Sequence, residues 1–194
     1  MIKNLRYDQI FFQHISYFSH NSLKEFANKL NLKISKKKIN FNYWGGTILL
    51  MMERKERKEK KISNLQNYKI MEYKFLNKFK IFTNKFSKIN KDLKNKNIIG
   101  YGAGQNTPII GYHLNSNLNF LNYIVDENTN KFNLRCINTK PKIQKLNKQD
   151  LKNNYFLITA IDNSRIIEKK LINIGINKEK IINLKKKLNQ ENIY

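Results

Sequence analysis

A glycine-rich turn and a following aspartate form the pattern in this sequence that is best suited to binding chemistry. Gly100, Gly102 and Gly104 follow an apolar run, and Asp126 ends the next apolar run. Such a turn between a strand and a helix lets the backbone approach an anion, and the N–H groups at the helix start can hold phosphate. An acidic group at the end of the second strand often takes ribose hydroxyls. The pattern predicts a nucleotide- or phosphate-binding turn, with Asn106 beside it.

The same turn also fits a purely structural role. A GxGxG sequence often serves only to pack a helix against a strand, and the third glycine of GxGxxG is replaced here by the Gln-Asn-Thr of residues 105–107. Both interpretations stay open. A dehydrogenase is disfavoured, because little chain follows the turn from which a substrate domain could form.

A second candidate site is the stretch "YDQIFFQHISYF" at residues 7–18, where aromatic rings surround the single imidazole of His14. Rings around an imidazole can form the wall of a pocket and exclude water. The alternative is that His14 is a partly buried histidine of an aromatic core. The residue types alone do not separate these two hypotheses.

The elements that follow predict one helix and two strands. Ser22 and Glu25 form an S-x-x-E capping box that predicts a helix over 22–31. Residues 32–41 alternate in strand fashion, and "TILLMM" at 47–52 predicts a second strand after the Gly45-Gly46 turn signal. Short strands of this kind usually complete a sheet whose other strands lie elsewhere.

A charged run at 53–61 leads into a predicted helix over about 66–94. Its apolar residues recur at steps of three and four, which places them on one stripe. They are Phe75, Phe79, Phe82, Phe86, Ile89 and Leu93. The stripe could form a coiled-coil seam, but its phenylalanines favour docking of the helix on a neighbouring domain.

The remainder predicts a small α/β domain. The strand before the glycine turn is followed by a helix with Thr107 as N-cap and Pro108 at its first position. Strands follow at 121–127 and 155–160, then a helix that stops at Gly175, then a strand at 180–184. This order predicts a parallel Rossmann-like sheet with right-handed crossovers. The predicted boundaries are 1–53, 54–95 for the linker and helix, and 96–190.

The composition argues against several classes of partner. The formal charge of +24 would attract phosphate, but only five of the 38 basic residues are Arg, the side chain that nucleic-acid binders favour. Electrostatic RNA association therefore stays a lesser hypothesis. Cys136 is the only cysteine, which excludes an internal disulfide or CxxC metal site and fits a reducing cytoplasm. No apolar run reaches the length of a membrane span or resembles a signal peptide.

From residue 7 to about 185, the order of motifs resembles the S-adenosylmethionine-dependent C-methyltransferases of nucleotide-linked deoxysugars. The matching stretches are "YDQIFFQHISYFSHNSLKEF", "WGGTILLMM" and "GYGAG…LNYIVDEN". The resemblance implies that residues 1–53 end a class I methyltransferase sheet, with a helix and an antiparallel strand pair. A separate Rossmann-like C-terminal domain would follow.

The resemblance also implies roles for individual residues. His14 falls on the position of the base that removes a proton beside the keto group, and Phe11, Gln13 and Tyr17 fall along the sugar pocket. Imidazole suits this task, because carbon must become enolate-like before it can attack a sulfonium methyl. The sequence departs from the family pattern at 11–13, where Phe-Phe-Gln replaces Tyr-His-Glu, and at Trp44 and Leu49, which replace His and Arg.

The family's zinc-binding and S-adenosylmethionine-binding halves have no counterpart in this sequence. Either another polypeptide supplies the missing half, or the chain is a truncated or split gene product, or it is a remnant kept for its C-terminal domain. The leading expectation is that a separate subunit binds S-adenosylmethionine, that this chain holds no metal, and that alone it is inactive. The alternative function is a non-catalytic module for nucleotides or nucleotide sugars, built on residues 97–185.

Overall fold

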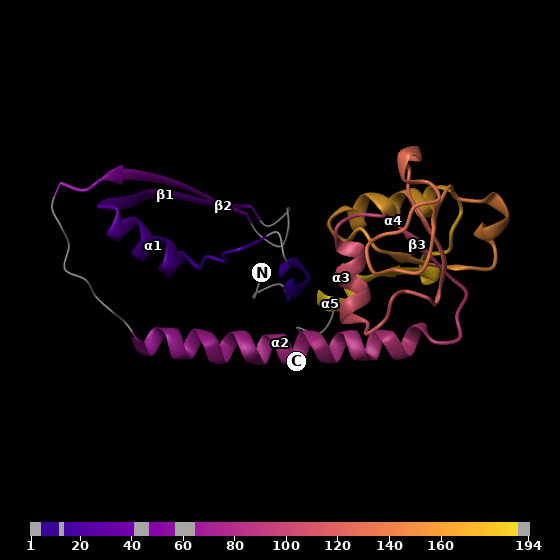
Figure 1. Ribbon diagram of the computed structural model, residues 1–194, viewed down its shortest axis with the longest axis horizontal. Helices are drawn as coiled ribbons and strands as arrows, with labels where there is room; N and C mark the ends of the chain where they lie inside the picture. Colours follow the sequence, from indigo (N-terminus) through magenta and orange to yellow (C-terminus); the bar gives the residue numbers. More distant parts are fainter. Residues whose placement is uncertain (1–4, 12–13, 41–46, 57–64, 190–194) are drawn as a thin grey trace. The chain divides into compact units, whose positions relative to one another are not determined.

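The fold was analysed in a computed structural model, which describes residues 5–11, 14–40, 47–56 and 65–189 (Figure 1). It confirms a mixed α/β fold with a two-stranded antiparallel sheet and a five-stranded parallel sheet. The chain divides into two compact units, residues 1–77 and 78–194. The boundary falls inside the long helix α2 (Leu65–Leu93), which belongs to the segment 54–95 that the sequence predicts to be a linker and helix.

The first unit contains a helix and a strand pair. Its elements are η2 (Tyr7–Gln9), α1 (His20–Lys29), β1 (Leu32–Asn40) and β2 (Thr47–Arg54), followed by the first part of α2. β1 and β2 run antiparallel, with a register shift between Ile34 and Lys36. α1 packs against β1. Helix and strands therefore lie where the sequence predicted them.

The cap of α1 was predicted wrongly. The N-cap is Ser19, whose side chain accepts a hydrogen bond from the Ser22 backbone N–H at 3.1 Å, while the Ser22 hydroxyl accepts one from the Ser19 backbone N–H at 2.8 Å. Ser22 is thus the third residue of the helix rather than its cap. A serine can fill the reciprocal position usually held by Glu or Gln, because its hydroxyl also accepts a hydrogen bond.

The second unit contains the parallel sheet, in the order β5-β4-β3-β6-β7. Its strands are β3 (Ile98–Tyr101), β4 (Leu121–Val125), β5 (Ile143–Gln144), β6 (Tyr155–Ile158) and β7 (Ile181–Asn183). Its helices besides α2 are α3 (Asn106–His113), α4 (Ser164–Asn173) and α5 (Leu184–Asn189). The chain first builds outward from β3 through β4 to β5, and then crosses to β6 on the other side of β3. The Rossmann-like arrangement is therefore confirmed.

Two details of this unit differ from the sequence prediction. β5 was missed, because a strand of two residues is too short to show an alternating pattern. Thr107 is not the N-cap of α3. Gln105 holds that position, and the Thr107 hydroxyl donates to the Gly102 carbonyl at 3.0 Å instead. The stop at Gly175 is confirmed, since α4 ends at Asn173 and Gly175 adopts φ +92°.

The apolar stripe of α2 forms part of the core of the second unit. Phe82, Phe86, Ile89 and Leu93 are all buried. The ring of His113, on α3, meets Phe82 edge-on at 4.7 Å and lies 5.3 Å from Phe86. The stripe therefore docks the helix on a domain, as predicted. In the described part of the chain, no helix is both long and apolar enough to cross a membrane.

We expect Phe86→Ala to lower the free energy of unfolding of the second unit by about 3–5 kcal/mol, because the fully buried ring leaves a cavity. Urea denaturation followed by the fluorescence or circular dichroism of the whole chain measures this. The matched control is Ile81→Ala on the same helix, whose side chain is 41 % exposed and should cost much less. Equal losses in the two variants would contradict the docked stripe.

Tyr123 joins β4 to the loop before β6. Its hydroxyl donates to the Asp150 Oδ2 at 2.7 Å and accepts from the Asn147 backbone N–H at 3.4 Å. Burial, followed by the bond to Asp150, raises the pKa of Tyr123 to about 12. The folded state therefore holds this proton more tightly than the unfolded chain does.

The pKa of Tyr123 is raised in the folded state. The stabilisation of the fold by the protonated Tyr123 hydroxyl is therefore complete below pH 10.0, the ordinary pKa of tyrosine, and is lost as the pH rises toward about 12. The unfolding free energies of the wild-type protein and Tyr123→Phe should therefore differ most near pH 9, with the gap narrowing through this window. Urea denaturation of both proteins at several pH values measures this difference. Groups other than Tyr123 ionise in both proteins, so their effect on the unfolding free energy cancels in the difference. A gap that stayed constant from pH 9 to 12 would count against this assignment.

Candidate functional site

The glycine turn lies at the point where the chain order of the sheet reverses, between the carboxyl ends of β3 and β6. In open α/β sheets this is the usual crevice for a ligand. Here the loop after β6 approaches the turn closely at Gly102. A Cβ built on Gly102 would lie 2.4 Å from the Cβ of Ala160, and Gly102 adopts φ +102°. Glycine at this position is thus required by backbone geometry and by the close approach of the loop after β6.

The backbone N–H groups of the turn already have partners within the protein. The Gly102 N–H donates to the Val125 carbonyl at 2.7 Å. The Ala103 N–H donates to the Asp126 Oδ2 at 2.8 Å, and the Gly104 N–H donates to the Thr107 hydroxyl at 3.1 Å. These three donors are therefore engaged in holding the turn, rather than directed at a phosphate.

Asp126 acts as the centre of this hydrogen-bonded turn. Its Oδ1 accepts from the Asn128 N–H at 2.9 Å, and its Oδ2 lies 3.3 Å from the Lys131 Nζ. Lys131 in turn donates to the Ala103 carbonyl at 2.8 Å. The carboxylate side chain is only 14 % exposed, so it binds the protein's own backbone first. Binding of ribose by Asp126 stays a prediction.

The tip of the turn is its accessible part. Gly104 is exposed, with open space where a Cβ would stand, and Asn106 is half-buried at the start of α3. Nearby, burial raises the pKa of the Cys136 thiol, and this outweighs the lowering by a hydrogen bond to Thr107 and by the charge of Lys131. Cys136 is thus a poor nucleophile at neutral pH. In the described ranges, no three His, Cys, Asp or Glu side chains gather as metal ligands.

The second candidate site is an aromatic cluster in the first unit, made of Phe11, His14 and Tyr17. The ring centroids of Phe11 and His14 lie 4.5 Å apart, and those of His14 and Tyr17 lie 5.8 Å apart, edge-on. The imidazole is exposed, and Tyr17 is 45 % exposed. His14 is therefore accessible from solvent, while aromatic rings flank it.

Hydrogen bonds hold this cluster in a fixed bend. The His14 N–H donates to the Phe11 carbonyl at 3.0 Å. The Tyr17 hydroxyl accepts from the Phe11 N–H at 3.0 Å and donates to the Gln9 carbonyl at 3.1 Å. The bend places the side chains of Phe11, His14 and Tyr17 beside one another. These bonds preorganise the imidazole without engaging its ring nitrogens in any hydrogen bond between described residues.

The segment before the cluster is anchored to α2. The Tyr7 hydroxyl donates to the Phe75 carbonyl at 2.9 Å, and their rings meet edge-on at 5.2 Å. Arg6 and Asp8 form a two-pronged ion pair, with both N–O distances 2.7 Å. Such pairs are rigid as well as strong. The aromatic residues before His14 thus also hold the segment in place.

The predicted site residues therefore fall into two groups in different units. Phe11, His14 and Tyr17 come together in the first, and Gly102, Gly104, Asn106 and Asp126 come together in the second. Gln13 and Trp44 lie outside the described residues. The sequence analysis missed two residues that contact the turn. Lys131 binds the Ala103 carbonyl and Asp126, and the Thr159 hydroxyl donates to the Gly102 carbonyl at 2.6 Å. In a lysine-rich chain, nothing in the local pattern marks either residue.

No family model matches the sequence, and no curated protein matches it.

We expect Gly102→Ala to destabilise the second unit by about 2–4 kcal/mol, because the new methyl would overlap Ala160 and the positive φ disfavours an L-residue. Thermal or urea unfolding measures this. Gly104→Ala is the control within the same turn, since open space surrounds its Cβ position, and should change stability by less than about 1 kcal/mol. A similar loss in both variants would contradict the close approach of the loop after β6.

Proposed function

We propose that this chain is part of an S-adenosylmethionine-dependent C-methyltransferase that acts on a nucleotide-linked keto-deoxysugar. The observation that carries the proposal is the solvent-accessible imidazole of His14, flanked by Phe11 and Tyr17. An imidazole sealed in a core could not reach a substrate. The order of motifs from residue 7 to about 185 supplies the class of reaction.

In this proposal His14 acts as the general base. A ring nitrogen takes a proton from the carbon beside the keto group, and the C–H electron pair becomes an enolate. That carbon would then take the methyl group of the donor, whose S–CH3 bond breaks and leaves its electron pair on the sulfur as a neutral thioether. His14 would later release its proton to water. Phe11 and Tyr17 supply apolar walls that limit access of water to the enolate, and the hydrogen bonds of Tyr17 fix the bend that carries the base.

S-adenosylmethionine would supply the methyl group from a separate subunit. The glycine turn of this chain fits the cofactor poorly, since its three N–H groups are bonded internally and Gly102 meets Ala160. The first unit does offer a surface for a partner. In the described part of the chain β1 and β2 pair only with each other. Leu49 and Met51, on one face of this pair, are 71 % and 52 % exposed. Open apolar strands are typical association surfaces.

The alternative of a non-catalytic nucleotide module at the glycine turn has less support. A nucleotide there would use the exposed tip around Gly104 and Asn106, because the loop after β6 lies close against Gly102 and the turn's N–H groups are bonded internally. The aromatic cluster would also have no role in such a module. We therefore place catalysis first.

The test uses the tagged chain, purified from its own cells together with the proteins that bind it. Methyl transfer from labelled S-adenosylmethionine to a nucleotide-linked keto-deoxysugar is then measured. We expect His14→Gln to reduce the rate by about 10²–10⁴-fold, the usual contribution of a general base. His20→Gln is the matched control, because His20 is also exposed in the first unit but starts α1, and it should leave the rate unchanged.

Deuterium uptake from heavy water at the carbon beside the keto group separates proton removal from methyl transfer. His14→Gln should slow both by about the same factor, while the chain purified alone should show no methyl transfer. Absence of activity in the co-purified material, or equal rates in the His14 and His20 variants, would refute the proposal.

A further inference from the structure

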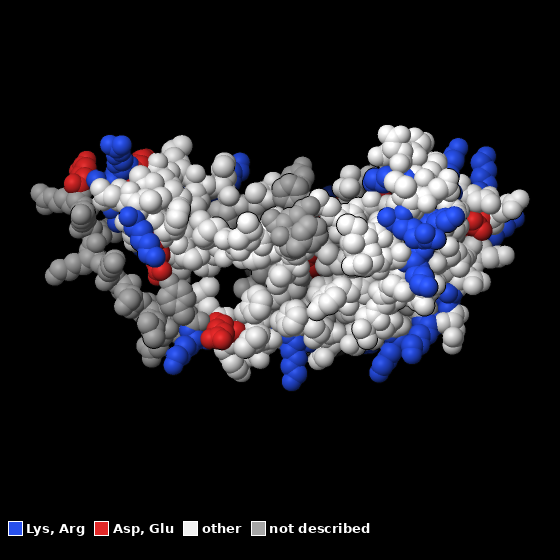
Figure 2. Space-filling view, in the orientation of Figure 1, with Lys and Arg blue, Asp and Glu red and all other residues white. Residues whose placement is uncertain are grey.

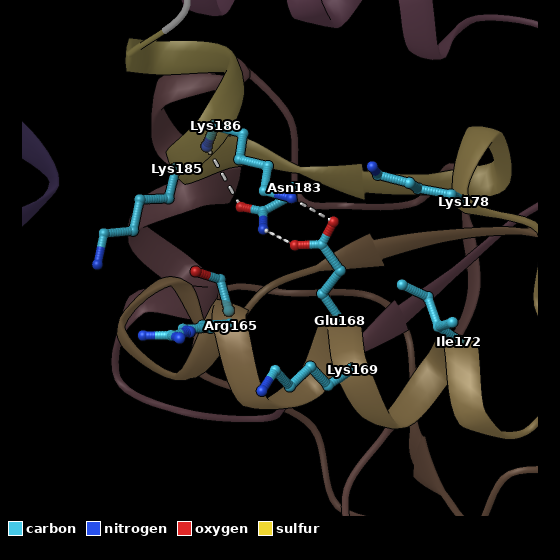
Figure 3. Close-up of a pocket in the computed structure, with 9 residues that line it drawn as sticks. Arg165, Glu168, Lys169, Ile172, Lys178, Asn183, Lys185 and Lys186 are labelled. Atoms are coloured by element: carbon cyan, nitrogen blue, oxygen red, sulfur yellow. Dashed lines mark hydrogen bonds and ion pairs between the residues drawn. The ribbon is translucent and has the colours of Figure 1, made fainter.

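A basic groove runs along the edge of the second unit, between α4, β7 and α5 (Figure 3). Its volume is about 650 Å³, which is within the range of small-ligand sites. Five of its nine lining residues are basic, and one is acidic. The basic residues are Arg165, Lys169, Lys178, Lys185 and Lys186. The groove belongs to a single unit and lies apart from the glycine turn in the sequence.

Glu168 forms the floor of this groove and organises two of its walls. Its Oε2 accepts from the Asn183 side-chain amide at 2.9 Å, and its Oε1 accepts from the Lys186 Nζ at 2.6 Å. Burial raises the pKa of the Glu168 carboxyl, but these hydrogen bonds and the charges of Lys186 and Lys178 outweigh it, so the net pKa is lowered. Glu168 thus stays ionised at neutral pH and holds Lys186 in place.

The other cations remain available to a ligand. Between residues that the structure describes, the side chains of Arg165, Lys169 and Lys185 form no hydrogen bond or ion pair. Lys178 forms no hydrogen bond with Glu168, and its positive charge lowers the pKa of that carboxyl. Figure 3 shows Arg165 and Lys185 toward one end of the groove and Lys178 toward the other. One buried carboxylate cannot neutralise five cations. A concave site with excess charge of one sign concentrates ions of the other sign.

The lining also limits the kind of anion. Among the described residues, no aromatic side chain lines the groove, so this part of the lining offers no surface on which a base could stack. Single-stranded nucleic-acid sites normally combine basic and aromatic side chains, and this groove has only the first. Cations at both ends of a small hollow suit a compact ligand that carries several negative charges.

We propose that the groove between α4, β7 and α5 binds a small phosphate-rich anion, a diphosphate or polyphosphate group, through Arg165, Lys178 and Lys185. The inference is independent of the methyltransferase proposal, since it uses no residue of the aromatic cluster. The phosphate group could belong to an inorganic polyphosphate or to a nucleoside diphosphate, which present the same chemistry to these cations.

The test is calorimetric titration of the full chain with inorganic tripolyphosphate and, separately, with uridine diphosphate, at about 0.1 M salt. Lys178→Gln combined with Lys185→Gln should weaken tripolyphosphate binding at least tenfold. The matched control is Lys36→Gln with Lys38→Gln, which removes the same charge from exposed positions on β1 and should weaken it less than twofold. Figure 2 shows that basic side chains also cover surface outside the groove, so this control is essential.

Amide NMR shifts of Asn183 and Lys185 on addition of tripolyphosphate provide a second readout, independent of any change in stability. Stronger binding of uridine diphosphate than of tripolyphosphate would identify a nucleotide as the source of the phosphate, and the reverse would identify free polyphosphate. Equal weakening in both double variants, no binding of either probe, or tighter binding of a single-stranded RNA that tripolyphosphate does not displace would overturn the proposal.

Discussion

The close approach of Gly102 to Ala160 is the constraint on which the second unit depends. It lies at the carboxyl ends of the neighbouring parallel strands β3 and β6, where the chain order of the sheet reverses. Because no side chain fits between these backbones, the loop after β6 can donate the Thr159 hydroxyl to the Gly102 carbonyl at 2.6 Å. The carbonyl also accepts from Thr107 at 3.0 Å, which ties the start of α3 to the same point. Sheet, loop and helix are thus joined through one peptide group.

This constraint changes the meaning of the glycine pattern. A glycine-rich turn binds phosphate when its N–H groups point into an open crevice. In this chain the N–H groups of residues 102–104 bond to Val125, Asp126 and Thr107. Asp126, directly after β4, completes the turn by accepting from the Ala103 backbone N–H, and ribose binding by this carboxylate stays a prediction. The same sequence pattern fits both arrangements, because backbone conformation and packing, not residue type, decide where the N–H groups point.

The sequence predicted best those elements whose apolar residues decide the structure by themselves. The buried runs of β3, β4, β6 and β7 and the phenylalanine stripe of α2 were all predicted, because burial imposes their periodicity. The predictions failed where a polar side chain has more than one possible hydrogen-bond partner, or where a strand is very short. Ser19 and Ser22 both suit an N-cap, Thr107 has a partner in Gly102 that only the folded turn supplies, and β5 is too short to have a pattern. Of the site, the grouping of Phe11, His14 and Tyr17 followed from their nearness in sequence. The groove between α4 and β7 did not, because its lysines are hidden among many others.

That groove also shows why total charge is a poor guide to function. A uniform excess of lysine raises the potential everywhere and favours no single place on the surface. What distinguishes the groove is local. The buried carboxylate of Glu168 binds Asn183 and Lys186, while among described residues the side chains of Arg165, Lys169 and Lys185 have no hydrogen-bond or ion-pair partner. Placing like charges around one hollow costs free energy in the absence of a counter-ion, and that cost is recovered when an anion enters. A compositional bias toward lysine supplies the charges, but only the fold, by setting α4 beside β7 and α5, concentrates them.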